Sequence, residues 1–193
     1  MTSATVAFSV TDFLLSRASE PRLTEPAPGP AILARAFACA ARTPDHALLR
    51  PWRYLVVEGD GRDRLGELLA STAPADDEAK QAKLRKAPLR APMVIVGIAS
   101  PTPHPKVPEV EQVMSAAVGM GFLELALADA GFGVMWRSGD VAHHPDVRKG
   151  LGLAEGETIT GFLYVGTVLE AKPPVPRPEP ERFVRRWPED GPL

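Results

Sequence analysis

Apolar and polar residues follow two different spacings along the chain, and together they predict helices that alternate with strands. In the helical segments apolar residues recur three and four positions apart, whereas the strand segments are short and rich in β-branched and aromatic residues. The predicted helices are 11–17, 30–42, 62–70, 76–86, 109–130 and 143–151. The predicted strands are 52–57, 93–98, 131–136 and 159–166. Strands separated by helices indicate one sheet with helices packed on both faces.

The helix predicted over 109–130 is apolar most of the way round, so it must be buried on several sides. Gly119 and Gly121 lie in its interior, where each costs about 1 kcal/mol relative to alanine. We therefore expect another backbone or a ligand to lie close to the helix at these positions.

A chain of 193 residues can bury enough apolar surface for one compact domain, which we place at 1–171. Proline accounts for 21 residues, against a usual share of about 5%. Seven of the prolines follow Lys172, in a segment that is too polar and too interrupted for a helix or a central strand. We expect 172–193 to be an extended tail, either disordered or laid against a partner subunit through Phe183 and Trp187.

Charge and cysteine content agree with a cytoplasmic protein. The formal net charge of -2 gives no reason to expect a nucleic acid or a membrane as partner. The longest charge-free apolar stretch, 113–123, is shorter than the roughly 20 residues that a membrane span needs. The single cysteine, Cys39, cannot form a disulfide within one chain, and we expect it to pack as a small hydrophobe.

Missing motifs exclude several classes of site. The sequence has no P-loop, no zinc-ligand spacing of cysteine and histidine, and no Gly-x-Ser-x-Gly motif, so we expect no metal and no serine nucleophile elbow. It also lacks the Gly-x-Gly-x-x-Gly that follows the first strand of a Rossmann unit. A nicotinamide coenzyme must therefore bind in another way.

Arginines and hydroxyl groups lie just after several predicted elements, where a scaffold can present hydrogen-bond donors to a phosphate group. They are Arg17 and Ser19, Arg42 and His46, and Arg137 and Ser138. Structural roles are open alternatives: the two helix-end arginines suit capping, and His46 suits an exposed loop. Trp136 suits the core, and His143 with His144 suits the start of a helix.

The order and spacing of four segments resemble the nitroreductase family over about 13–167. The segments are Arg17-Ala18-Ser19 with Arg22; Arg42-Thr43-Pro44-Asp45-His46 leading to Pro51-Trp52-Arg53-Tyr54; Gly131-Phe132-Gly133 leading to Trp136-Arg137-Ser138-Gly139; and Gly161-Phe162-Leu163-Tyr164-Val165-Gly166-Thr167. Pro-Asp-His, Lys106-Val107-Pro108, Glu111-Gln112 and Trp-Arg-Ser are similar to the short, single-domain NAD(P)H nitroreductase branch. The resemblance implies an α+β fold, a three-layer α/β/α sandwich with a mixed, mostly antiparallel sheet that dimerises through long central helices.

The same resemblance implies a homodimer with two FMN sites at the subunit interface. Arg17, Ala18 and Ser19 of one subunit would hold FMN, and Arg42 and His46 would come from its partner. Trp136, Arg137 and Ser138 would complete the site. NAD(P)H would lie near the segment Ala126, Leu127, Ala128, Asp129, Ala130 and Gly131.

The implied function is that of an FMN-dependent NAD(P)H oxidoreductase. NADH or NADPH would deliver a hydride to FMN and leave, and a nitroaromatic, quinone or related small molecule would then take the electrons in the same cleft, in a ping-pong cycle. No catalytic side chain is expected, because the flavin carries the chemistry. Two alternatives stay open: a specialised FMN dehydrogenase or reductase for one metabolite, and a non-catalytic flavin-binding protein.

Two positions depart from the family pattern. Ala18 stands where a second arginine is usual, and the loss of one charge-assisted hydrogen bond weakens binding by about 1.5 to 3 kcal/mol. Arg50 stands where a glutamine is usual before Pro-Trp. Arg50 either replaces the lost phosphate contact or directs specificity towards an acidic substrate.

Overall fold

The computed structural model describes residues 9–170, 172 and 176–188. Its α-helices are α1 (Val10–Ser16), α2 (Pro30–Ala40), α3 (Asp60–Ala70), α4 (Glu78–Arg85), α5 (Glu109–Asp129), α6 (Asp140–His143) and α7 (Pro145–Gly150). Its strands are β1 (Leu23–Thr24), β2 (Trp52–Glu58), β3 (Met93–Ala99), β4 (Gly133–Arg137) and β5 (Thr158–Val168). Short 3-10 helices are η1 (His46–Leu48), η2 (Ala87–Arg90) and η3 (Pro180–Arg182).

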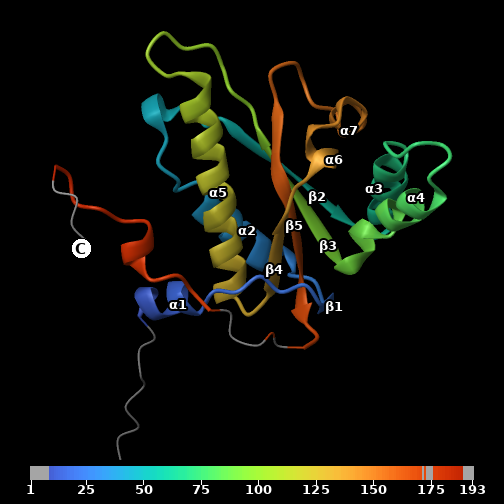
Figure 1. The fold of residues 1–193 in the computed structure, drawn as a ribbon, viewed down its shortest axis with the longest axis horizontal. Coiled ribbons are helices and arrows are strands. Elements are labelled where there is room, and N and C mark those ends of the chain that lie inside the picture. The colour runs from blue at the N-terminus through green and yellow to red at the C-terminus, as the bar shows by residue number, and fades with distance from the viewer. Residues whose placement is uncertain (1–8, 171, 173–175, 189–193) are drawn as a thin grey trace, which may run out of the picture.

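One five-stranded sheet organises the fold, with β5 near its centre (Figure 1). β3 pairs along one side of β5, from Met93 opposite Val165 to Ala99 opposite Thr158. β4 pairs along the other side of β5, β1 pairs with its last residues, and β2 lies beyond β3 at the outer edge. Every strand pairing in the described residues is antiparallel, which confirms the predicted mostly antiparallel sheet.

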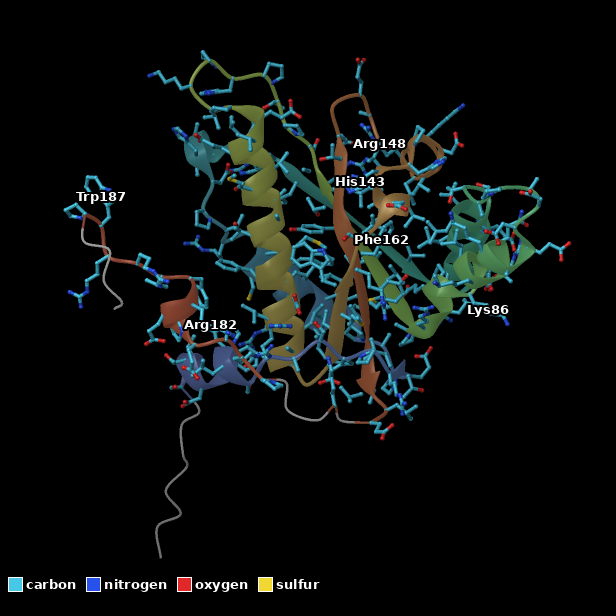
Figure 2. All side chains as sticks on the ribbon, in the orientation of Figure 1. Lys86, His143, Arg148, Phe162, Arg182 and Trp187 are labelled. Carbon is cyan, nitrogen blue, oxygen red and sulfur yellow. The ribbon has the colours of Figure 1, made fainter. Side chains whose placement is uncertain are left out.

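Helices cover both faces of this sheet, which confirms the predicted three-layer α+β arrangement (Figure 1). The cluster under α2 and α5 is built on Ile95, Met120, Leu123, Leu127 and Leu163. The cluster on the opposite face, where α3, α6 and α7 pack, is built on Leu65, Val96, Ala142, Val147 and Phe162 (labelled in Figure 2). β3 lies between the two clusters, and all of its residues are buried, as its continuous apolar sequence predicts.

The long helix α5 is the main element of the first layer. By length and composition alone it is apolar enough to cross a membrane, but 44% of its most apolar part is buried inside the protein. The buried side of α5 packs on α2 and the sheet, so α5 is a core helix. Its outer side keeps Val110, Met114 and Val118 exposed at intervals of four residues, and these form one stripe along the helix, the α5 stripe.

The two interior glycines of α5 have different surroundings. A Cβ on Gly119 would lie 2.9 Å from the Tyr54 hydroxyl and 3.4 Å from the Ala40 carbonyl oxygen, which confirms the expected close approach. No atom of the chain lies within 4 Å of a Cβ on Gly121, so at that position the expected approach of another backbone or a ligand stays a prediction. Gly121 is half-buried and follows Val118 by less than one helical turn, so it leaves room for an approaching surface beside the α5 stripe.

The prediction that Cys39 is buried is wrong, because its side chain is exposed. The helical period explains the error. Ala36 and Ala40 are four residues apart, and both face the core, so Cys39, one residue before Ala40, is rotated away from it. The apolar composition of 32–41 indicated a helix but did not by itself identify the core-facing positions.

The helix predicted over 143–151 corresponds to α7, and the short helix α6 just before it was not predicted. Pro145 is the first residue of α7, where a proline needs no backbone donor, and it prevents one continuous helix. The His144 side chain accepts a hydrogen bond at 3.3 Å from the Asp146 backbone N–H, so His144 caps α7. The predicted helix start is thereby confirmed for His144, whereas His143 is the last residue of α6.

The described part of the tail approaches α1. A guanidinium N–H of Arg177 donates a hydrogen bond to the Arg17 carbonyl oxygen. Beyond η3, Trp187 lies away from the body of the protein (Figure 2) and is 95% exposed, and Phe183 is also exposed. The domain boundary at 171 and several of the tail prolines lie outside the described residues, so that division of the chain stays a prediction.

Candidate functional site

The carboxyl end of β4 presents Trp136, Arg137 and Ser138 at a cleft. Alternation along the strand directs Trp136 towards the α2 and α5 layer and Arg137 towards the opposite layer. The Trp136 indole N–H donates to the Thr160 carbonyl oxygen at 3.2 Å. A Cβ on Gly161 would lie 2.0 Å from that indole nitrogen, so the glycine is what allows the ring to pack on β5. Trp136 is therefore held in one orientation. It packs against the core, as predicted, and it also lines the cleft.

Arg137 carries the clearest sign of a ligand. Its guanidinium carbon lies 5.5 Å from the centre of the Tyr164 ring. Its Nε is buried and has no hydrogen-bond partner among the described residues. Burial raises the pKa of Tyr164, although the Arg137 charge opposes that effect, so the phenol stays neutral beside the guanidinium. A buried donor without a partner is costly, and a bound acceptor would satisfy it.

The cleft beside Arg137 has a volume of about 480 Å³ and lies between the β4 end and the α4–η2 region. Lys83, Arg90 and Arg137 supply three cationic side chains to it. Its apolar walls include Leu69, Leu84, Phe162 and Tyr164. Cations above an apolar, partly aromatic floor fit a planar molecule that carries negative charge. Sequence reasoning missed Lys83 because the charges of 76–86 suggested only a solvated helix. It missed Arg90 because that residue lies outside every predicted element.

Arg17 lies at the end of α1 and forms an ion pair with Glu124 of α5, with 3.0 Å between Nη1 and Oε1. The Glu124 side chain is only 11% exposed, and that of Arg17 is 32% exposed. The Arg17 guanidinium is thus directed at α5 and not at the carbonyl groups of α1, which argues against a capping role. A guanidinium has five N–H donors, so the pair with Glu124 leaves donors free for a phosphate.

The segment that follows Arg17 runs beside the outer edge of β4. The Glu20 backbone N–H donates to the Val134 carbonyl oxygen at 3.0 Å. Ala18 and Ser19 are half-buried there, close in sequence to the paired residue. The structure therefore brings the segment that follows 17–19 beside the start of β4, the strand whose other end carries Trp136 and Arg137.

Arg42 and His46 lie at the other end of α5. His46 Nδ1 is 3.1 Å from Glu111 Oε2 in the first turn of that helix. Glu111 and Glu124 are about 20 Å apart along the axis, since an α-helix rises about 1.5 Å per residue. Within one chain, Arg42 and His46 are therefore not brought together with Arg17.

The loop that carries His46 has an unusual backbone. The backbone φ angles of Ala47, Leu48 and Arg50 are 64°, 56° and 51°, values that residues other than glycine rarely adopt. Such residues cost roughly 1 to 3 kcal/mol each and are found mostly at functional sites. The Asp45 carboxylate holds the loop by accepting the Leu49 N–H at 3.2 Å and the Arg50 N–H at 2.7 Å. Neither the strain nor the role of Asp45 was predicted.

The segment expected near NAD(P)H forms the last turn of α5 and the link to β4. Leu127 is fully buried in the core, and Ala126 and Ala128 are half-buried. Asp129, Ala130 and Gly131 are exposed, so only the end of the segment reaches solvent. The nicotinamide assignment for Ala126–Gly131 stays a prediction.

Comparison with known proteins agrees with this fold and supports an oxidoreductase with an α+β fold. The model of the "Nitroreductase family" matches residues 16–167, so the chain belongs to the nitroreductase family. A relative from Escherichia coli (strain K12), named "Putative NAD(P)H nitroreductase YdjA", is 40% identical over 177 residues, which cover 90% of this chain and 96% of that protein.

Solved structures share the fold at lower sequence identity. A nitroreductase-like family protein from Bacillus cereus has a TM-score of 0.84 and 24% identity, covering 98% of this chain and 100% of that one. The FMN and NADPH-dependent nitroreductase NfnB from sphigopyxis sp. strain HMH has a TM-score of 0.71 and 19% identity, covering 92% and 98% of the two chains. These two likenesses support the fold alone.

Proposed function

We propose that this protein is an FMN-dependent NAD(P)H oxidoreductase that works as a homodimer. The observation that carries the proposal is the buried, unpartnered Nε of Arg137 in a cleft with Lys83 and Arg90. A ligand with negative charge and an aromatic surface would satisfy the Arg137 Nε and would neutralise the positive charges of Lys83 and Arg90. The relative from Escherichia coli is named as an NAD(P)H nitroreductase, and the NfnB structure is described as FMN and NADPH-dependent, which agrees with this choice.

The residues present fit FMN. Arg17 and Ser19 would hold the phosphate group, and Ala18 would contribute only backbone groups. Trp136, Arg137 and Ser138 would border the ring system. When bound, FMN supplies the electron transfer between NAD(P)H and a second substrate.

The protein's own side chains would position the reactants and set the charge of the cleft. Arg137 and Arg90 place positive charge next to the apolar walls, where it stabilises negative charge on an aromatic ring more strongly than in water. Leu69, Leu84 and Phe162 exclude water from the same region. The donor and the acceptor would use the cleft in turn, and we infer a ping-pong order with a nitroaromatic or quinone as acceptor.

A second copy of the chain would supply Arg42 and His46. Ala117 and Val118 lie midway between Glu111, which holds His46, and Glu124, which holds Arg17. If two α5 helices pack antiparallel about a twofold axis near Val118, the Glu111 end of each lies beside the Glu124 end of the other. The α5 stripe is centred on the same region, and the open space beside Gly121 permits close approach.

The oxidised protein should be yellow, and anaerobic NADPH or NADH should bleach its flavin absorbance. Colourless, monomeric protein that takes up no added FMN would overturn the proposal. Yellow protein that neither coenzyme bleaches would favour the non-catalytic flavin-binding alternative. Product analysis with nitroaromatics, quinones and enones would separate a general reductase from an enzyme specialised for one metabolite.

A further inference from the structure

A second cleft, of about 370 Å³, lies between the end of α2 and the start of β2. Arg42, Arg50 and Trp52 line it, together with Leu48 and Asp45. Arg42 also belongs to the proposed FMN site of the partner subunit, whereas Arg50 and Trp52 have no part in that site. The cleft therefore needs its own explanation.

No other protein group in the described residues occupies the two guanidinium groups of this cleft. In the described part of the chain, neither Arg42 nor Arg50 forms an ion pair or a side-chain hydrogen bond. The nearby Asp45 carboxylate is occupied by the backbone N–H groups of Leu49 and Arg50. Two guanidinium groups on one cleft suit a carboxylate or a phosphate, whose oxygens match their paired donors.

The loop around Arg50 is held firmly. The Trp52 backbone N–H donates to the Arg50 carbonyl oxygen at 2.8 Å, and the Ser100 N–H donates to the Pro51 carbonyl oxygen at 2.9 Å. Pro51 is fully buried, and Asp45 fixes the Arg50 backbone from the other side. A binding surface built in advance loses less entropy when a ligand arrives.

Apolar surface lies next to these charges. Trp52 is half-buried, and Leu48 is 75% exposed on the rim of the cleft. An indole ring beside two guanidinium groups suits a ligand that carries both an oxyanion and an aromatic ring. A free phosphate would leave this apolar surface unused.

We propose that the Arg42–Arg50–Trp52 cleft is a specificity subsite for the oxyanion of an aromatic reactant. This rests on the proposed function, because the antiparallel pairing of α5 would set the cleft of one subunit beside the flavin site of the other. The oxyanion is either a carboxylate on the electron acceptor or the extra phosphate that distinguishes NADPH from NADH. Arg50 is the side chain that selects this charge, and Arg42, whose guanidinium has five N–H donors, would contact both the partner's flavin and the oxyanion.

Equilibrium binding to the oxidised, FMN-loaded protein tests the subsite without turnover. One arm compares 4-nitrobenzoate with neutral 4-nitrobenzyl alcohol, and the other compares NADP⁺ with NAD⁺. We expect the anionic member of at least one pair to bind at least about tenfold more tightly, since charge-assisted hydrogen bonds are the strong ones. The arm that shows the preference identifies the source of the oxyanion.

The variant Arg50→Gln should remove that preference and leave binding of the neutral ligand unchanged. It keeps a long side chain that is not β-branched at a position with positive φ, so the backbone demand is similar. Arg64→Gln, which removes an exposed arginine of α3, is the matched control and should keep the preference. If Arg50→Gln does not fold, Arg50→Lys keeps the charge, loses the planar fork, and should reduce the preference by a smaller factor.

Equal binding within both pairs, or a preference that survives Arg50→Gln, would overturn the subsite. Loss of bound FMN in Arg50→Gln would also overturn it, because Arg50 would then belong to the flavin site. Failure of the proposed function is distinguishable from failure of the subsite. If the function is wrong, neither coenzyme bleaches the wild-type flavin, whereas the preference for the anionic ligand can still be measured.

Discussion

The Arg17 guanidinium lies 3.0 Å from the Glu124 carboxylate, and this contact joins the end of α1 to the C-terminal part of the core helix α5. Glu124 is nearly buried, so its charge needs a partner. Arg17 is therefore held at the edge of the candidate flavin site before any ligand binds. Such orientation of a binding side chain by a second residue is common at built sites.

Arg17→Ala should lower FMN affinity at least about tenfold and leave the dimer intact, because one charge-assisted phosphate contact is lost. The measurement is flavin content on purification, followed by FMN titration of the apoprotein. Arg22→Ala is the matched control, since Arg22 is nearby in sequence and pairs with the exposed Glu170. Unchanged flavin content in Arg17→Ala would contradict its role.

Glu124→Gln should weaken FMN binding less than Arg17→Ala does. Glutamine keeps a hydrogen-bond acceptor for Arg17 but removes the charge that orients it. FMN titration of the two variants side by side measures the difference. A larger loss in Glu124→Gln than in Arg17→Ala would show that Glu124 acts on the flavin site by another route.

Val118→Asp should shift the protein towards monomer, by at least about tenfold in the dimer dissociation constant. A carboxylate at the centre of the α5 stripe would meet its own copy across the twofold axis, and like charges repel in a buried interface. Sedimentation equilibrium measures the change. Leu89→Asp is the control, because Leu89 on η2 is 44% exposed and Val118 is 43% exposed. A dimer of unchanged affinity would place the interface elsewhere.

The Arg53–Glu157 pair should make stability depend on pH. The Arg53 guanidinium donates two hydrogen bonds to the Glu157 carboxylate, one of them at 2.7 Å from Nε to Oε1. These hydrogen bonds, opposed by burial, lower the pKa of Glu157 from 4.5 to about 2. The stabilisation is complete above about pH 4.5 and is lost as the pH falls towards 2, to a total of at most about 3 kcal/mol.

Glu157→Gln should therefore be less stable than wild type at pH 7, and the gap should narrow at pH 3. Urea unfolding at both pH values measures it. Glu67→Gln removes the carboxylate of an exposed pair with Arg85 and should have little effect. A gap that stays constant between the two pH values would rule out the linkage.

Two glycine substitutions should act in opposite directions. Gly161→Ala places a Cβ 2.0 Å from the Trp136 indole nitrogen, and overpacking of this kind costs about 1 to 3 kcal/mol. Gly61→Ala lies in α3 with its nearest neighbour, Val57 Cγ1, at 3.4 Å, and should stabilise by up to about 1 kcal/mol. Thermal unfolding measures both, and Trp136 displacement should change tryptophan fluorescence only in Gly161→Ala.

The sequence by itself determined the layers, the family and most of the elements, although not β1 or α6, because apolar spacing and short motifs are local information. The continuous apolar run of β3 indicated a strand buried on both faces, and Pro30 indicated a helix start. The motif from Trp136 to Ser138 indicated one end of the site. The periodicity of 32–41 was read less well, since composition alone did not show that Cys39 turns away from Ala36 and Ala40.

Only the tertiary structure decided which side chains meet. Lys83 and Arg90 join Arg137 through the packing of α4 and η2 near the β4 end, across more than forty positions of sequence. Likewise, only the fold shows that Glu124 holds Arg17 and Glu111 holds His46, about 20 Å apart on one helix. The physical reason is that spacing along the chain specifies a residue's place on its own element, whereas contacts between elements depend on how whole faces pack.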